Sequence, residues 1–154
     1  MVCGLIEFDR NGAAADYVAV PARELVAKPR SISHPDTATL PLAALTAWQA
    51  LVDYAAVEPG EQVLVAGSAG GVGGFAVQIA AMPGAQVSAT GRAEDADYVR
   101  NLGAQAFIGS DIMLPGKASG LDVVVDTVGG AVLDGAYGVL RPGGRLVTLA
   151  APPS

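Results

Sequence analysis

Apolar and polar positions along the second part of the chain repeat in a pattern of short strands followed by helices. The run Gln62–Ala66, after Pro59 and Gly60, is typical of a buried strand. A glycine-rich turn follows, and the next apolar residues have the i, i+3, i+4 spacing of a helix with one buried face: Val72, Phe75, Ala76, Ile79 and Ala80. Gly84 then marks the end of that helix.

The same alternation continues to the end of the chain. It predicts strands at residues 86–90, 106–108, 122–126 and 145–150, helices at 95–102 and 132–140, and a turn at 141–144. Strands that alternate with helices form a parallel sheet covered on both faces and joined by right-handed crossovers. The sequence therefore predicts an α/β fold, a Rossmann-type doubly wound parallel sheet of about five strands.

The first part of the chain has a different pattern. Residues 17–20 and 25–29 are strand-like, and Asp36 is a possible cap for a short helical turn. Pro41 suits the first turn of a longer helix that reaches about Ala56. Leu45, Trp48 and Val52 share one face of that helix.

Composition and charge exclude several classes of protein. Of the 154 residues 51% are hydrophobic and 16% are charged, which excludes intrinsic disorder. The net charge is −6 and the basic residues are scattered, so we expect neither nucleic acid nor a membrane as partner. The one cysteine and one histidine exclude a disulfide framework and a Cys/His zinc site. The first residues lack a signal-peptide layout, so we expect a cytoplasmic protein.

The glycine-rich turn has the register Ser68-x-Gly70-x-x-Gly73, between a strand and a helix. In the dinucleotide fingerprint one glycine lets the backbone approach a pyrophosphate and another lets the helix lie close to the strand, while the helix N-terminus offers free N–H groups. We therefore predict a pyrophosphate loop made of Ser68, Ala69, Gly70, Gly71, Val72 and Gly73. Tight turning alone would be a purely structural explanation, but five glycines within residues 67–74 exceed what a turn requires.

The end of the second strand bears on the choice of cofactor. About twenty residues after Gly70 stand Thr90, Gly91 and Arg92, where NAD-binding proteins place a carboxylate for the ribose hydroxyl. A basic residue without an acid suits the 2′-phosphate of NADP, so these three residues favour NADP (NADPH). Arg92 has an alternative interpretation as a solvated charge neutralised by Glu94 and Asp95.

Four segments, at residues 40–51, 69–78, 122–130 and 140–147, together resemble the zinc-independent branch of the medium-chain dehydrogenase/reductases, the quinone oxidoreductase-like proteins. The resemblance implies an NADPH-binding Rossmann domain, hydride transfer to a quinone, enone or related activated carbonyl compound as small-molecule substrate, and no metal. By position it places Thr46 beside the nicotinamide, the turn from Ser68 to Gly73 at the pyrophosphate, and Val128 and Gly129 beside the far side of the cofactor. Thr46 could equally be a helix hydroxyl that bonds its own backbone.

The resemblance also implies a division of the chain. Residues 1–35 resemble the last strands of a GroES-like substrate domain, and residues 36–154 are expected to form the dinucleotide-binding domain, without the sixth strand of relatives. A chain short at both ends would expose apolar surface, which predicts a homo-oligomer or a missing partner segment. No catalytic residue is assigned, and activity of the short chain stays open. The alternatives are a non-catalytic nucleotide-binding module or remnant and, with less support, an S-adenosylmethionine-dependent methyltransferase.

Overall fold

The computed structural model describes residues 14–109, 116 and 118–150. The chain divides into two compact units, Met1–Leu42 and Ala43–Ser154. The division between a GroES-like segment at 1–35 and a cofactor domain at 36–154 stays a prediction.

The described part of the first unit contains two short helices, η1 (Ala22–Glu24) and α1 (His34–Ala38). Residues 17–20 form no strand and Leu25, whose backbone is extended, takes part in a single bridge, so the two strand-like pieces do not form strands. Tyr17 is 94% exposed, and an apolar run without a core beside it gains nothing from strand formation. Helix α1 is capped by Ser33, not by Asp36 as predicted, because the Ser33 hydroxyl accepts a hydrogen bond from the backbone N–H of Asp36.

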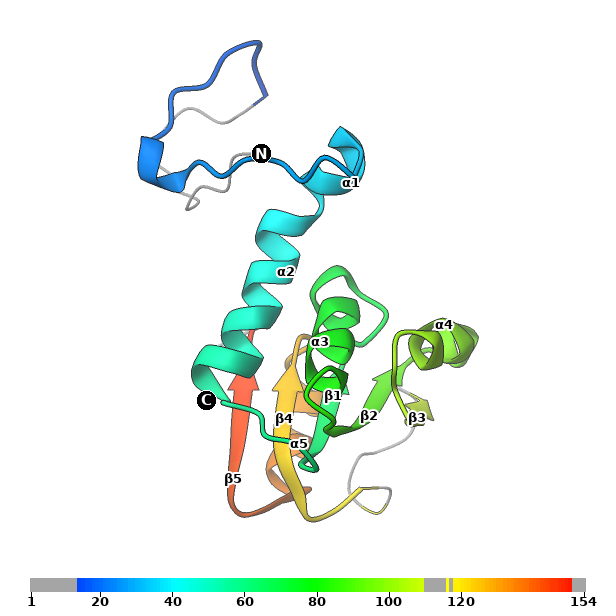
Figure 1. Ribbon diagram of the computed structural model, residues 1–154. Helices are drawn as coiled ribbons and strands as arrows, with labels where there is room; N and C mark the ends of the chain where they lie inside the picture. Colours follow the sequence, from blue (N-terminus) through cyan, green and yellow to red (C-terminus); the bar gives the residue numbers. More distant parts are fainter. Residues whose placement is uncertain (1–13, 110–115, 117, 151–154) are drawn as a thin grey trace. The chain divides into compact units, whose positions relative to one another are not determined.

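The second unit is built on a five-stranded parallel sheet in the order β3-β2-β1-β4-β5 (Figure 1). This confirms the predicted fold class. The strands are β1 (Gln62–Ala66), β2 (Gln86–Gly91), β3 (Ala106–Gly109), β4 (Leu121–Asp126) and β5 (Leu140–Thr148). The helices that connect them are α3 (Gly71–Ala81), α4 (Ala96–Asn101), which follows the short η3 (Ala93–Asp95), and α5 (Ala131–Tyr137).

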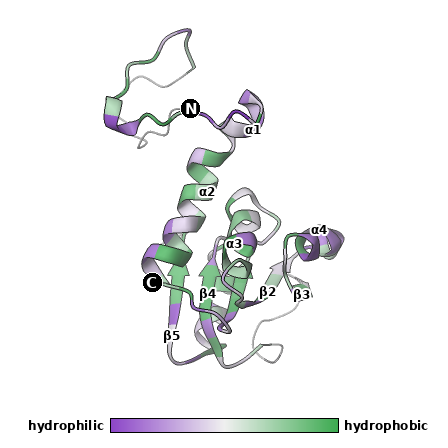
Figure 2. Ribbon diagram, viewed as in Figure 1, coloured by the Kyte–Doolittle hydropathy of each residue, from purple (hydrophilic) through white to green (hydrophobic). Residues whose placement is uncertain are grey.

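Two hydrophobic clusters lie on opposite faces of this sheet. Alternate strand residues such as Val63 and Val65 pack with α3 and α4 in the larger cluster, whereas Leu64 and Val124 pack with α5 in the smaller one. Strands buried on both faces are continuous apolar runs, and Figure 2 shows β1 and β4 as hydrophobic while α4 is mainly hydrophilic. The sheet is therefore wound on both sides, as the alternation of strands and helices requires.

Residues 141–144 do not form a separate turn before the fifth strand, which corrects the prediction. They lie inside β5, where the pairing with β4 passes from Leu121↔Leu140 to Val123↔Arg145. The extra residues on β5 bulge out of the ladder, and Gly143 with φ +79° takes up the left-handed conformation that this bulge needs. The turn chemistry of Pro142 and Gly143 was recognised, but its place within a strand was not.

The long helix α2 (Leu40–Trp48) begins at the end of the first unit and continues in the second as the π-helix η2 (Gln49–Tyr54). Its buried residues are the small ones and one leucine, namely Ala47, Ala50 and Leu51. The face shared by Leu45, Trp48 and Val52 stays 46%, 47% and 41% exposed. Small side chains thus bring the backbone of this helix close to the sheet, while the larger ones point away from the core.

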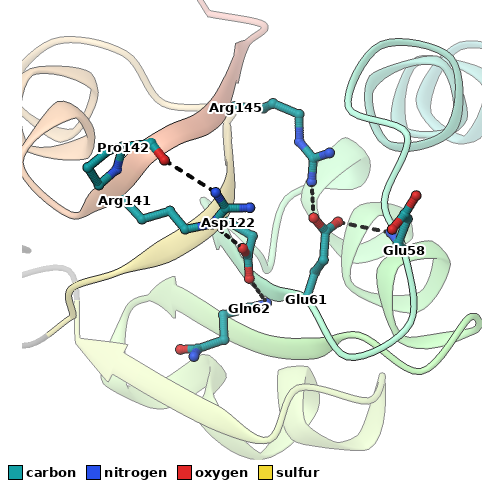
Figure 3. A network of polar contacts seen from close by, with 7 residues as sticks. All are labelled: Glu58, Glu61, Gln62, Asp122, Arg141, Pro142 and Arg145. Carbon is teal, nitrogen blue, oxygen red and sulfur yellow. Dashed lines mark hydrogen bonds and ion pairs between the residues drawn. The ribbon is translucent and has the colours of Figure 1, made fainter.

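Polar side chains connect the strands at the amino edge of the sheet (Figure 3). Asp122 on β4 accepts a hydrogen bond from the backbone N–H of Gln62 at 2.7 Å and forms an ion pair with Arg141. Glu61 pairs with Arg145 and accepts a hydrogen bond from the backbone of Glu58. The loop before β1 is therefore fastened to β4 and β5 at the edge opposite the glycine turn. Within the described residues, no helix is long and apolar enough to cross a membrane.

Candidate functional site

The carboxyl ends of β1 and β4 lie side by side, with Ala66 paired to Asp126. The chain leaves β1 toward β2 and leaves β4 toward β5, in opposite directions along the sheet. This point of reversal is the place where doubly wound sheets form a ligand crevice. The glycine turn after β1 and the turn after β4 meet here, because the Thr127 hydroxyl donates to the carbonyl of Ala66 at 2.8 Å.

Two glycines of the first turn are required by close approach. Gly67 has φ +74°, and a Cβ there would lie 2.4 Å from Oγ1 of Thr127 and 2.8 Å from Cγ2 of Val128. A Cβ on Gly73 would lie 2.1 Å from the carbonyl oxygen of Gly67, so only glycine lets α3 approach the end of β1. Gly73 thus has the close packing that the fingerprint predicts. Gly67 was not among the predicted site residues, and its place directly after an apolar strand was the one signal for it.

The start of α3 is open. Gly70 is the N-cap and is exposed, and the first helical hydrogen bond runs from the N–H of Gly74 to the carbonyl of Gly70. The N–H groups of Gly71, Val72 and Gly73 precede that bond and have no partner within the helix by its geometry. Among the described residues, the one atom within 4 Å of a Cβ on Gly71 is Cβ of Ala43, at 3.9 Å. Ala69 and Val72 are half-buried against the core. As far as the structure describes the chain, the turn therefore presents amides and no side chain at its mouth, which fits a diphosphate.

Ser68 and Thr90 are in direct contact. Ser68 is fully buried, and both its backbone N–H and its hydroxyl donate to the carbonyl of Thr90, at 2.9 Å and 2.8 Å. The N–H of Gly67 lies 3.4 Å from the Thr90 hydroxyl oxygen. A Cβ on Gly91 would come within 3.6 Å of the Ser68 hydroxyl. These contacts fix the position of the glycine turn against the end of β2.

Arg92 lies just after β2 with its side chain 74% exposed. It forms ion pairs with Glu94 at 3.1 Å and with Asp95 at 3.5 Å. The side chain of Arg92 is therefore open enough to meet a 2′-phosphate. It is also paired with the two acids that the alternative interpretation of a neutralised surface charge requires. Ion pairs this exposed contribute little free energy, so the guanidinium can exchange partners readily.

The turn after β4 is organised by a buried carboxylate. Asp126 is fully buried and accepts hydrogen bonds from the N–H groups of Val128 and Gly129 at 2.9 to 3.1 Å. Gly129 has φ +79° and is buried, whereas the Val128 side chain is 53% exposed. The predicted residues Val128 and Gly129 thus lie at the crevice, beside Gly67.

Thr46, on α2, lines a second part of the site. It borders a cavity of about 370 Å³ together with residues near the end of β5, among them Thr148 and Leu149. Ala43, three residues earlier, lies near Gly71 at the start of α3. The helix that carries Thr46 therefore lies beside both the glycine turn and the end of β5.

Comparison with known proteins identifies the family. The profile of the zinc-binding dehydrogenase family matches residues 71–154, more than half of the chain. The chain therefore belongs to this family, within the medium-chain dehydrogenase/reductases. No group of three or more His, Cys, Asp or Glu suited to a metal occurs in the part of the chain that the structure describes, and zinc independence stays a prediction.

Two curated relatives show the range of proteins that contain such a domain. The polyketide synthase GfsB of Streptomyces halstedii is 40% identical over 141 residues, which are 90% of this chain and 2% of that protein. The mitochondrial NAD(P)H oxidoreductase RTN4IP1 of Mus musculus is 34% identical over an alignment that covers 93% of this chain and 39% of that protein. The chain thus spans about two fifths or less of the length of these relatives.

Solved structures agree with this assignment. The CurK enoyl reductase has a TM-score of 0.78 at 36% identity, over 86% of this chain and 42% of that one. The quinone oxidoreductase of Coxiella burnetii has a TM-score of 0.76 at 34% identity, over 80% of this chain and 39% of that one. The resemblance to quinone oxidoreductase-like proteins expected from the sequence is confirmed at the level of the family.

Proposed function

We propose that this chain binds NADPH and is the cofactor-binding part of a zinc-independent reductase. The observation that carries the proposal is the open glycine turn at the point where the strand order reverses, beside a second strand that ends with Thr90 and Gly91 and is followed by Arg92. A dinucleotide lies across such a crevice, with its adenosine at the end of the second strand. The family match and the name of the NAD(P)H oxidoreductase relative support a nicotinamide cofactor.

Most of the predicted residues then have a defined task. The free amides of Gly71, Val72 and Gly73 bind the diphosphate, while Ser68 holds the turn in place through Thr90. Arg92 pairs with the 2′-phosphate after leaving Glu94 and Asp95. Val128, Gly129 and Thr46 lie on the other side of the crevice, at the nicotinamide end. When bound, NADPH supplies the hydride.

The acceptor class rests on the relatives. Enoyl and quinone reduction are named for two proteins whose structures match this chain, and polyketide synthases contain similar segments. We propose an enone, quinone or related activated carbonyl compound as acceptor. The cavity between Thr46 and Thr148 would receive it beside the nicotinamide, where apolar walls such as Leu146 and Leu149 exclude water.

A second candidate is a cofactor-binding module that carries out no reaction by itself. The chain covers about two fifths of the length of the oxidoreductase relative, so the activity of that whole protein is only a proposal here. Hydride transfer requires the acceptor to be held close to the nicotinamide, which binding of the cofactor alone does not provide. The methyltransferase interpretation receives no support from the family match.

One titration separates these possibilities. NADPH is added to the protein while nicotinamide fluorescence is followed, NADH serves as comparison, and a quinone is then added while the loss of NADPH absorbance is recorded. Binding followed by turnover supports the reductase, and binding without turnover supports the module. If neither NADPH nor NADH binds at millimolar concentration, the proposal is refuted.

A further inference from the structure

Neither the glycine turn nor the dinucleotide fingerprint assigns a role to the carboxylate of Asp126. Asp126 ends β4, is fully buried, and forms no ion pair among the residues that the structure describes. Burial of an ionised carboxylate is costly unless hydrogen bonds satisfy its oxygens. Here Oδ1 accepts from the N–H groups of Val128 and Gly129, and Oδ2 accepts from the N–H of Gly129 and from the hydroxyl of Thr148 at 2.9 Å.

These partners come from two different elements. Val128 and Gly129 belong to the turn between β4 and α5, whereas Thr148 is the last residue of β5. The backbone of Asp126 adds a further connection, because its carbonyl accepts from the N–H of Leu149 at 2.8 Å. One side chain thus sets the distance between a turn and the end of the neighbouring strand. The preceding residues Val123 to Val125 are as fully buried as Asp126 and are apolar, so burial alone does not require a carboxylate here.

Both elements that Asp126 holds border the candidate site. The turn touches the glycine turn, since a Cβ on Gly67 would meet Val128 at 2.8 Å. Thr148 lines the same cavity as Thr46. If the adenosine half of the cofactor lies at β2, as strand order requires, these walls face the nicotinamide half.

We propose that Asp126 is a positioning residue for the nicotinamide half of the cofactor site. This inference rests on the proposed function above. Asp126 acts through the amides of Val128 and Gly129 and through the Thr148 hydroxyl, which it holds in place before the cofactor arrives. The adenosine half depends on Ser68, Thr90 and Arg92, which make no contact with Asp126 in the described hydrogen bonds. Loss of the carboxylate should therefore affect the two halves of the cofactor unequally.

The test compares two probes, NADPH and adenosine 2′,5′-bisphosphate, which carries the adenosine half alone. In Asp126→Ala we expect NADPH affinity to fall by about tenfold or more, since several hydrogen bonds to a charged group are lost. Affinity for the bisphosphate should stay within about twofold of the wild type. Asp126→Asn should lose less, because its amide oxygen still accepts from Gly129 and its amide nitrogen can donate to Thr148.

A matched control is Asp122→Ala, at the amino end of the same strand. Asp122 also accepts a backbone N–H, from Gln62, but lies at the opposite edge of the sheet. This variant should lower the melting temperature and leave the ratio of the two affinities unchanged. If Asp126→Ala does not fold, Thr148→Val replaces it. We then expect a smaller loss of NADPH affinity, again without a matching loss of affinity for the bisphosphate.

The outcomes are distinguishable from those of the proposed function. A wild-type protein that binds neither probe refutes the proposed function and this inference with it. If the wild type binds both probes and the Asp126 variants lose affinity for NADPH and for the bisphosphate by the same factor, Asp126 only stabilises the fold. Variants that keep NADPH affinity unchanged also overturn the inference.

Discussion

The carbonyl oxygen of Thr90 accepts two hydrogen bonds from Ser68, one from the backbone N–H at 2.9 Å and one from the hydroxyl at 2.8 Å. The two residues are 22 positions apart and both are buried. This pair joins the glycine turn to β2, the strand that Arg92 follows. The two places where the adenosine half of a dinucleotide would bind are therefore held in one arrangement before any ligand is present.

Ser68→Ala should weaken this connection without removing it, because the backbone hydrogen bond to Thr90 remains. Loss of one neutral hydrogen bond costs about 0.5–1.5 kcal/mol of unfolding free energy, which corresponds to a few degrees of melting temperature. NADPH affinity should fall only slightly, since the hydroxyl proton already points to Thr90. Thermal unfolding and fluorescence titration measure both effects. An unchanged melting temperature with a large loss of NADPH affinity would instead show direct contact between the hydroxyl and the cofactor.

The open start of α3 allows a substitution that separates binding from stability. Gly71 is exposed, and the nearest atom to an added Cβ, among the residues with a described position, is Cβ of Ala43 at 3.9 Å, so Gly71→Asp should be accommodated. An acidic residue in the first helical turn favours the helix by about 0.3–1 kcal/mol, but it repels a diphosphate. We expect an equal or higher melting temperature together with a loss of both NADPH and NADH binding, measured by fluorescence.

Gly71→Asn is the matched control, since it has the same shape without the charge. It should retain more affinity for both nucleotides than Gly71→Asp. Equal affinities in the two variants and in the wild type would mean that the diphosphate lies elsewhere.

Arg92 decides the choice between the two nicotinamide cofactors in our proposal. Arg92→Glu should lower the affinity for NADPH by about 10- to 100-fold, because a charge-assisted hydrogen bond to the 2′-phosphate is lost. The affinity for NADH should hardly change. Arg100→Glu is the control, because Arg100 is also exposed and also paired with an acid, Asp97, at 3.1 Å. Dissociation constants for both cofactors provide the comparison. Equal losses of NADPH and NADH in Arg92→Glu would contradict this role.

Much of this architecture could be predicted because local sequence and tertiary context agree. The apolar run of β1 begins and ends where it was predicted, at Gln62 and Ala66. Close helix packing at Gly73 follows from its place in a strand–turn–helix unit. In the structure a Cβ on Gly73 would lie only 2.1 Å from the carbonyl oxygen of Gly67. In such segments periodicity, turn residues and burial all favour one structure.

The remainder depends on contacts between distant residues, which no local pattern records. The role of Gly67 depends on Thr127, sixty residues away, and its positive φ cannot be read from its neighbours in sequence. Asp126 appears in the sequence as the end of a valine run, and its task becomes visible only with Thr148 beside it. The bulge at Gly143 depends likewise on how β5 pairs with β4. Each of these features is fixed by the sheet and not by its own segment.

Acid should loosen the amino edge of the sheet through Asp122. The backbone N–H of Gln62 and then the guanidinium of Arg141 lower the pKa of Asp122 below its ordinary value of 3.8. A carboxyl with a lowered pKa in the folded state stabilises the fold at pH values above the ordinary one, and this contribution is lost as the pH falls through the folded-state pKa. The melting temperature of the wild type should therefore fall more steeply below about pH 4 than that of Asp122→Asn, which has no proton to bind there.

Arg141→Gln provides the intermediate case, because it removes one of the two main causes of the lowered pKa and leaves the hydrogen bond from Gln62 in place. Its melting temperature should fall with acid less steeply than that of the wild type and more steeply than that of Asp122→Asn. Thermal unfolding at several pH values between 7 and 3 measures the three slopes. Identical slopes in all three proteins would show that Asp122 is not coupled to folding at this edge, and that the contacts in Figure 3 do not determine its acid sensitivity.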